Sequence, residues 1–261
     1  MDTPHRISTD VDGDVWRVVL DRPEAGNAID PDLADALVGA LADRPARTRA
    51  VLLLGAGPRF CVGGDVAAMA AADDRPAFIG ALAQRWHDAV RAIIGSPVPV
   101  VAGVQGAVAG AAVGLVGACD LVVCARSTKI RPAYGAIGLS PDGGTSWALT
   151  RTLGAPRALD LMLTNGTLTA AEAHQAGLVA RLVDDDALPA AAAELAAQVA
   201  AGPVRAMVRT RGLVRRAAVT TLHAQLDDEA RLIVESAADP EAAEGIAAFV
   251  EKRAADFRVE P

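Results

Sequence analysis

The sequence predicts an α/β fold with mainly parallel strands, followed by a helical segment at the C-terminal end. Hydrophobic residues make up 52% of the 261-residue chain, which is enough to bury a large core. Strand-like and helix-like stretches alternate up to about residue 187, as they do where helices join parallel strands. Beyond that point the pattern is helical only. We therefore expect an α/β core over residues 1–200 and a helical segment over residues 201–261.

Composition and charge exclude several classes of protein. The net charge is −7, and the aromatic residues are three Trp, one Tyr and four Phe. A protein that stacks bases above a basic groove needs more rings and more positive charge, so we expect no nucleic-acid partner. The polar N-terminus lacks the apolar core of a signal peptide, which indicates a cytoplasmic protein. The cysteines lack zinc-binding spacing, which indicates free thiols and no metal site: Cys61, Cys119 and Cys124.

The first part of the chain contains well-marked turns and helix caps. An Asp12-Gly13 turn between two strand-like runs predicts a β-hairpin. Asp30 followed by Pro31 predicts the start of a helix that ends near Leu41. The other elements expected up to residue 94 are the strands Arg6–Asp10, Val15–Leu20 and Val51–Leu54 and the helices Val66–Ala72 and Phe78–Ile94.

The uncharged stretch from Ile93 to Cys119 is long enough to raise the question of a membrane span. Pro97, Pro99 and six glycines interrupt it. We therefore interpret it as a buried strand, Val98–Val104, then a tight turn and a helix of small residues, and we expect no membrane partner. The features expected beyond it are the strand Leu121–Cys124, a helix break at Gly202-Pro203 and a last helix from Pro240.

Two glycine-rich segments, Phe60–Asp65 and Gly106–Gly114, each follow a strand and open a helix. Backbone N–H groups at a helix start have no partner within the helix and point towards an approaching ligand. Two such groups that converge on one point form an oxyanion hole. Tight packing of strand against helix is the alternative interpretation. Neither segment contains the GxGxxG pattern of a dinucleotide site.

Six segments in a fixed order resemble the crotonase (enoyl-CoA hydratase/isomerase) superfamily over nearly the whole chain. They are Leu20–Ala28, Gly55–Asp65, Pro97–Asp120, Ile137–Gly144, Ala173–Val179 and Phe249–Arg253. The resemblance is greatest to the branch of aspartate-dependent enoyl-CoA and ring-opening phenylacetyl-CoA isomerases. It implies a spiral of repeated β-β-α units and a C-terminal segment that builds a homotrimer or a dimer of trimers. It also implies an acyl-CoA substrate, with coenzyme A as part of the thioester and no permanently bound cofactor.

The resemblance also assigns roles to residues. The backbone amides of Gly64 and Ala111 would hold the thioester oxygen, and Met69 would line the acyl pocket. Phe257 would reach the coenzyme A of a neighbouring subunit. The adenine would lie along the turn formed by Pro23, Glu24 and Ala25 and near the carboxylate of Asp65. The tail arginines are expected on a solvated helix face or, alternatively, at coenzyme A phosphates: Arg205, Arg209, Arg215 and Arg216.

The chain departs from the family's hydratases at the two positions that hold their catalytic glutamates. Gly114 and Tyr134 stand there, so we do not expect two-glutamate hydration. A carboxylate occurs instead at Asp142, where isomerases of the family carry an aspartate. One carboxylate suffices to move a double bond, because it removes a proton from one carbon and returns it to another. We therefore expect an isomerase with Asp142 as acid and base.

Other interpretations of Asp142 remain open at this point. It could cap the helix that starts near Gly144. It could be a nucleophile, as in the family's 4-chlorobenzoyl-CoA dehalogenases, which carry an aromatic residue at the position of Tyr134 and a histidine at that of His87. His87 would then belong to the substrate pocket, although a partly buried structural histidine is the alternative. A family member that binds coenzyme A without catalysis is a further possibility.

Overall fold

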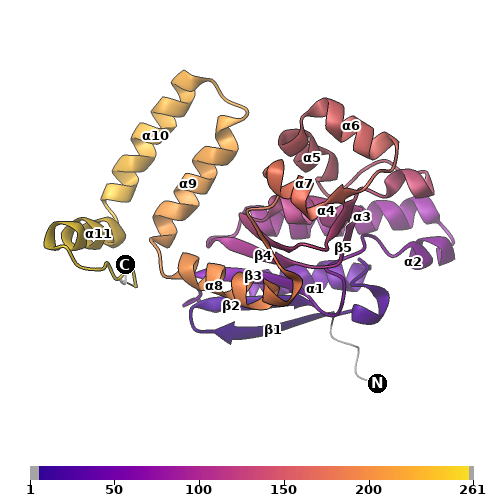
Figure 1. Cartoon of the computed structure of the whole chain (residues 1–261), viewed down its shortest axis with the longest axis horizontal. Coiled ribbons are helices and arrows are strands. Elements are labelled where there is room, and N and C mark those ends of the chain that lie inside the picture. Colours follow the sequence, from indigo (N-terminus) through magenta and orange to yellow (C-terminus); the bar gives the residue numbers. More distant parts are fainter. Residues whose placement is uncertain (1–5, 259–261) are drawn as a thin grey trace.

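The computed structural model describes residues 6–258 and shows an α/β fold with two sheets and a helical C-terminal segment (Figure 1). The larger sheet has the order β1-β2-β3-β4-β6-β9, and only its β1–β2 pair is antiparallel. Its strands are Ile7–Asp12, Val15–Leu20, Ala50–Gly55, Val100–Val104, Leu121–Ala125 and Arg181–Val183. The smaller sheet, β5-β7-β8, consists of Ala107–Ala109, Lys129–Arg131 and Leu168–Thr169.

Helices cover both faces of the larger sheet. Because side chains alternate along a strand, Val51 and Leu53 of β3 belong to the buried cluster that includes residues of α1, α3 and α4, whereas Leu52 belongs to the cluster with α8 on the opposite face. The α-helices α1 to α11 are Pro31–Ala42, Val66–Ala71, Arg75–Ile94, Ala111–Ala118, Thr145–Leu153, Ala155–Leu163, Ala170–Gln175, Leu188–Ala200, Val204–Ala217, Leu222–Ala237 and Pro240–Glu251. Three short 3-10 helices are η1 (Pro23–Ala25), η2 (Tyr134–Ile137) and η3 (Asp185–Ala187).

The elements expected from the sequence are present, with shifted ends. The hairpin is confirmed, and Asp30 caps α1 by accepting the Leu33 N–H at 2.8 Å. Helix α3 begins at Arg75, three residues before the expected start, because the Asp74 side chain caps it. The glycine-rich turn after β4 is more ordered than expected, since Ala107–Ala109 forms strand β5 against β7.

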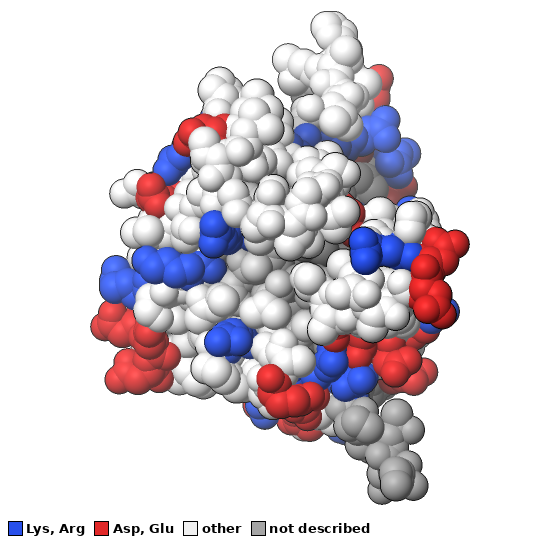
Figure 2. Space-filling view, turned by 90° about the vertical axis from the view of Figure 1, so that its right-hand side faces the viewer, with Lys and Arg blue, Asp and Glu red and all other residues white. Residues whose placement is uncertain are grey.

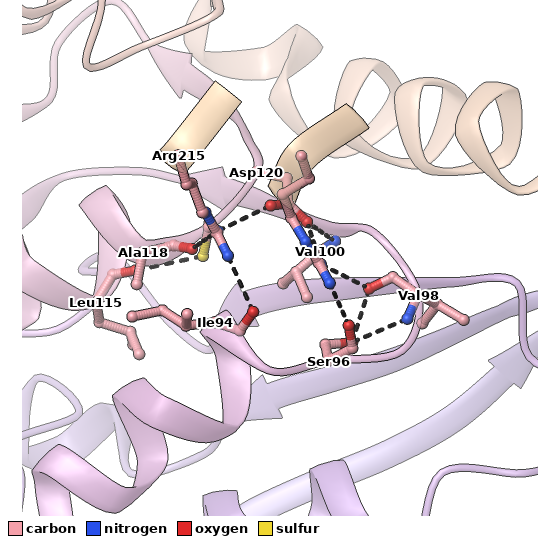
Figure 3. Close-up of polar contacts among 10 residues, drawn as sticks. Ile94, Ser96, Val98, Val100, Leu115, Ala118, Asp120 and Arg215 are labelled. Carbon is pink, nitrogen blue, oxygen red and sulfur yellow. Dashed lines mark hydrogen bonds and ion pairs between the residues drawn. The ribbon is translucent and has the colours of Figure 1, made fainter. Parts of the chain in front are cut away.

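Helix α9 is fastened to the core through Asp120, the residue before β6 (Figure 3). Its two carboxylate oxygens accept bonds from Arg211 Nη1 at 3.0 Å and from Arg215 Nη2 at 2.9 Å, and Oδ2 also accepts the Val100 N–H at 2.9 Å. Arg215 also donates to the carbonyl oxygens of Ile94 and Ala118. The expectation that Arg215 lies on a solvated face is therefore wrong.

Helices α10 and α11 lie apart from the sheets, beyond α9 (Figure 1). No single helix among residues 6–258 is long and apolar enough to span a membrane. The stretch Asp185–Ala200 together with α9 is long and apolar enough for a membrane span. However, the two helices are bent by 104° relative to each other, and α8 packs on the sheet.

We predict that Asp120→Ala lowers the free energy of unfolding by about 3 kcal/mol, because it leaves two largely buried guanidinium groups without their carboxylate. Chemical denaturation followed by circular dichroism measures the change. The control is Asp10→Ala, which breaks an exposed pair with Arg17 and should cost less than about 1 kcal/mol. Equal losses in the two variants would contradict the role given to Asp120.

Candidate active site

A cavity of about 430 Å³ lies between helices α2 and α3 on one side and η2 with the following loop on the other. Its walls are mostly apolar and include Val66, Met69, Leu82, Trp86, Ala136 and Leu139. Met69 was expected there from the sequence, and four other residues singled out in the sequence also line the cavity: Gly64, Ala111, Tyr134 and Asp142. The side of the molecule that carries α2 faces the viewer in Figure 2. Uncharged residues occupy most of its middle there, and charged side chains gather mainly towards its edges.

The two glycine-rich segments meet in the wall of this cavity. Cys61 pairs with the β5 segment, accepting the Ala109 N–H at 3.0 Å and donating its own N–H to Ala107 at 3.3 Å. Gly63 has φ +86°, and a Cβ there would lie 2.8 Å from the Ala109 carbonyl oxygen, so only glycine permits the approach. The close pairing thus places Gly64 and Ala111 at one cavity.

The amides of Gly64 and Ala111 are available to a ligand. Ala111 is the first residue of α4, so its N–H has no partner within the helix. Within residues 6–258, neither this N–H nor that of Gly64 donates a hydrogen bond to the protein. Two free donors beside a cavity can stabilise a developing oxyanion.

Helix α3 bonds both to the first residue of α4, Ala111, and to the loop that carries Asp142. The indole N–H of Trp86 donates to the Ala111 carbonyl oxygen at 3.2 Å. The next residue, His87, accepts the Gly143 N–H on its Nε2 at 3.1 Å. His87 is not among the residues that line the cavity, unlike the sequence expectation, because its ring is directed to the loop backbone.

Asp142 and Tyr134 form a close pair. The Tyr134 hydroxyl donates to Asp142 Oδ1 at 2.6 Å, and the tyrosine is only 9% exposed. Burial, and then the charge of Asp142, raise the pKa of Tyr134 above its usual range, so the hydroxyl keeps its proton. The Asp142 side chain does not cap α5, whose N-cap is Gly144 with φ +86°. The capping interpretation is therefore wrong.

Asp65, at the start of α2, bonds to Arg22, the residue before the turn η1. Its Oδ2 accepts a bond from Arg22 Nη1 at 2.7 Å, and its Oδ1 caps α2 through the Ala68 N–H at 3.0 Å. Burial alone would raise the pKa of Asp65, but the Ala68 amide and the Arg22 guanidinium outweigh it and hold the pKa below its usual value. Of the turn residues expected at the adenine, Pro23 and Glu24 are exposed and Ala25 is half-buried.

The remaining expected site residue lies away from the cavity. Phe257 packs near Gly245 of α11, where a Cβ would be 3.2 Å from its ring. Its contact with a neighbouring subunit stays a prediction. No cluster of three or more potential metal ligands occurs within the described residues.

Two residues at the site, Trp86 and Thr145, were not expected from the sequence. Trp86 is 1% exposed, and Thr145 is fully buried beside Tyr134 at 3.3 Å between their hydroxyl oxygens. The position of Thr145 directly after the two glycines of the Asp142 loop could have identified it from the sequence. Cys61 is also near, but burial raises the pKa of its thiol to about 12, so it is not a thiolate nucleophile at neutral pH.

Comparison with known proteins agrees with this arrangement. The family model described as Enoyl-CoA hydratase/isomerase matches residues 10–260. A "Probable enoyl-CoA hydratase" of Rhodobacter capsulatus is 34% identical over 253 residues, which cover 97% of this chain and 98% of the relative. The 1,2-epoxyphenylacetyl-CoA isomerase of Escherichia coli is 34% identical over 258 residues, which cover 96% and 97%.

A solved structure that is described as an enoyl-CoA hydratase has a similar fold. The crystal structure of an enoyl-CoA hydratase from Polaromonas sp. JS666 matches with a TM-score of 0.91 at 32% identity, covering 96% of this chain and 98% of that one. With family sequence and family fold both extending over almost its whole length, the chain is an enzyme of the enoyl-CoA hydratase/isomerase (crotonase) family.

Proposed function

We propose that the protein is an acyl-CoA isomerase that shifts a double bond, with Asp142 as acid and base. The observation that carries the proposal is the composition of the cavity. Among the described residues that line it, Asp142 is the only carboxylate, and it shares the cavity with the free amides of Gly64 and Ala111. A base and an oxyanion hole are the parts that enolate chemistry requires.

In the proposed reaction, Asp142 removes a proton from a carbon of the enoyl group. The electron pair of that C–H bond forms a new C=C bond to the thioester carbon, and the carbonyl π pair moves to the thioester oxygen, which becomes an enolate oxygen held by Gly64 and Ala111. Each such donor contributes about 3 kcal/mol to lowering the barrier. The proton then returns from Asp142 to a different carbon, so the double bond has moved and no atom is lost.

The substrate in this proposal is the thioester of coenzyme A, and no further cofactor takes part. We place the adenine at the η1 turn, formed by Pro23, Glu24 and Ala25, with Asp65 beside it. The acyl group is proposed to be uncharged and apolar, because the described part of the lining contains no Lys, Arg, His or Glu and its polar side chains are Tyr134, Ser140 and Asp142. A charged acyl group would lose its hydration there without gaining a partner.

Hydration by two glutamates has little support in the packing around Gly114. A Cβ there would lie 2.6 Å from the Gly143 carbonyl carbon and 2.8 Å from the Thr145 amide nitrogen. Real carbon atoms do not approach so closely, so the Asp142 loop takes the space that a glutamate stem would need. The same loop that supplies the carboxylate thus excludes the first hydratase residue.

The nucleophilic alternative, a dehalogenase-like reaction, would place the histidine at position 87 in the substrate pocket. His87 Nε2 instead accepts the Gly143 N–H and lies outside the lining. For this reason we prefer proton transfer by Asp142.

The C-terminal segment, residues 201–261, is proposed to build a homotrimer or a dimer of trimers. Its last two helices expose large apolar side chains, 53% to 86% each, at Leu222, Leu226, Ile233, Val234, Ile246, Phe249 and Val250. Phe257 would then meet a neighbour's coenzyme A. The cysteines Cys61, Cys119 and Cys124 are buried free thiols, which is typical of a reducing compartment, so a cytoplasmic location belongs to the same proposal.

Asp142→Asn should lower the turnover of a 3-enoyl-CoA at least about 100-fold, because the amide cannot accept the proton. Formation of the conjugated 2-enoyl-CoA, followed by absorbance, measures the rate, and calorimetry should give unchanged binding of the thioester. Asp186→Asn, at an exposed carboxylate in η3, is the control and should retain full activity. Unchanged turnover in Asp142→Asn would sink the proposal.

A panel of thioesters separates the remaining alternatives with the unaltered protein. Conversion of 3-enoyl-CoA supports isomerisation. Chloride release from 4-chlorobenzoyl-CoA favours Asp142 as nucleophile, hydration of 2-enoyl-CoA favours a hydratase, and binding of all esters without turnover favours a non-catalytic family member.

Gly114→Ala should destabilise the protein by about 1–3 kcal/mol and impair isomerisation, because the added carbon displaces the Asp142 loop. Thermal unfolding and the same absorbance assay measure both effects. The control Gly39→Ala lies in α1, where a Cβ meets no atom within 4 Å. We expect Gly114→Glu to lose isomerisation without gaining hydration, and a functional hydratase would refute the steric argument.

A further inference from the structure

The two carboxylate oxygens of Asp142 have different surroundings. Oδ1 accepts the Tyr134 hydroxyl at 2.6 Å, whereas no donor among residues 6–258 reaches Oδ2. Asp142 lines the cavity and is partly exposed to it. One oxygen is therefore occupied by the protein, and the other is free for a substrate.

The tyrosine is itself held by a third hydroxyl, that of Thr145. The Thr145 hydroxyl donates to the Gly110 carbonyl oxygen at 3.0 Å and lies 3.3 Å from the Tyr134 oxygen. Each hydroxyl has one proton to give. With the Thr145 proton directed to Gly110 and the Tyr134 proton directed to Asp142, each of these two buried hydroxyls donates its proton to an acceptor, and the hydrogen-bonded series has a definite direction.

The Gly110 carbonyl belongs to the same peptide unit as the Ala111 N–H, the expected oxyanion donor. A hydrogen bond to a peptide carbonyl polarises that unit and strengthens its N–H as a donor. Thr145 thus contacts both the support of the carboxylate and the peptide of the oxyanion hole. It is fully buried at the first turn of α5, so its position is set by packing.

The backbone before Tyr134 is held in an unusual conformation. Ala133, a residue with a side chain, has φ +63°, in the left-handed region that such residues rarely adopt. Strain of this kind persists only where the surrounding structure enforces it, and it concentrates at functional sites. Here it directs the tyrosine into the gap between Asp142 and Thr145.

We propose that Tyr134, supported by Thr145, is a positioning residue that locks Asp142 through Oδ1, so that Oδ2 alone carries the proton from one substrate carbon to the other. This inference rests on the proposed isomerase function. A locked carboxyl cannot rotate to exchange its proton with water between the two steps. The same oxygen therefore takes up and returns the same proton on one face of the enolate.

The test compares Tyr134→Phe with the unaltered enzyme on a 3-enoyl-CoA that carries deuterium at the carbon to be deprotonated. The unaltered enzyme should transfer part of the label to the new position. We expect Tyr134→Phe to lower kcat about 10- to 100-fold with KM within about twofold. It should also lose most of the transferred label to solvent, because the freed carboxyl can rotate.

Three further single variants and one double variant separate positioning from folding. Thr145→Val should reproduce the effect in milder form, and Thr145→Ser should restore both kcat and label transfer, because it keeps the hydroxyl. Thr152→Val removes a hydroxyl that bonds only within α5 and should behave as the unaltered enzyme. In the Asp142→Asn background, Tyr134→Phe should have no further effect on residual turnover.

The outcomes are distinct. Unaltered kcat and label transfer in Tyr134→Phe would overturn the positioning role while leaving isomerisation in place. A fall in kcat with label transfer retained would also overturn it, because the carboxyl would not have gained freedom. Absence of isomerisation by the unaltered enzyme would overturn the proposed function and this inference together.

Discussion

The pairing of the segment at Cys61 with strand β5 is the contact on which the rest of the site depends. Two backbone hydrogen bonds bring the glycine-rich segments together, and Gly63 allows an approach that a side chain would block. The N–H groups of Gly64 and Ala111 have no protein partner within residues 6–258, so this contact brings two free donors into a common cavity wall. The remaining parts of the site are arranged around them.

Helix α3 and the loop after η2 form the second half of that arrangement. Trp86 donates to the carbonyl oxygen of Ala111, and His87 accepts the N–H of Gly143, so adjacent residues of one helix bond to the segment of the oxyanion donor and to the loop of the carboxylate. The loop in turn packs on Gly114 so closely that no larger residue fits. The proposed chemistry therefore follows from packing: the fold makes room for one carboxylate, at Asp142, and removes the room for another.

The C-terminal helices are attached to the core by a separate ion-pair cluster around Asp120. Asp120 receives Arg211 and Arg215 from α9 and also a backbone amide of β4, so a single carboxylate connects the tail to two elements of the core. Beyond α9 the helices expose apolar side chains that the core does not cover. The C-terminal segment is thus fixed to the core through α9, and its last two helices leave apolar side chains exposed, which suits the proposed role in assembly.

The sequence by itself determined the α/β order, the capped start of α1, the two glycine-rich segments and the presence of a carboxylate at Asp142. These features are local, since periodicity, caps and glycine conformations act over a few residues. Only the tertiary structure decided that His87 serves the loop backbone, that Arg215 is paired, and that Tyr134 binds Asp142 and not solvent. Each of these depends on the angle and depth at which elements pack, and that geometry arises from the whole core and not from any single segment.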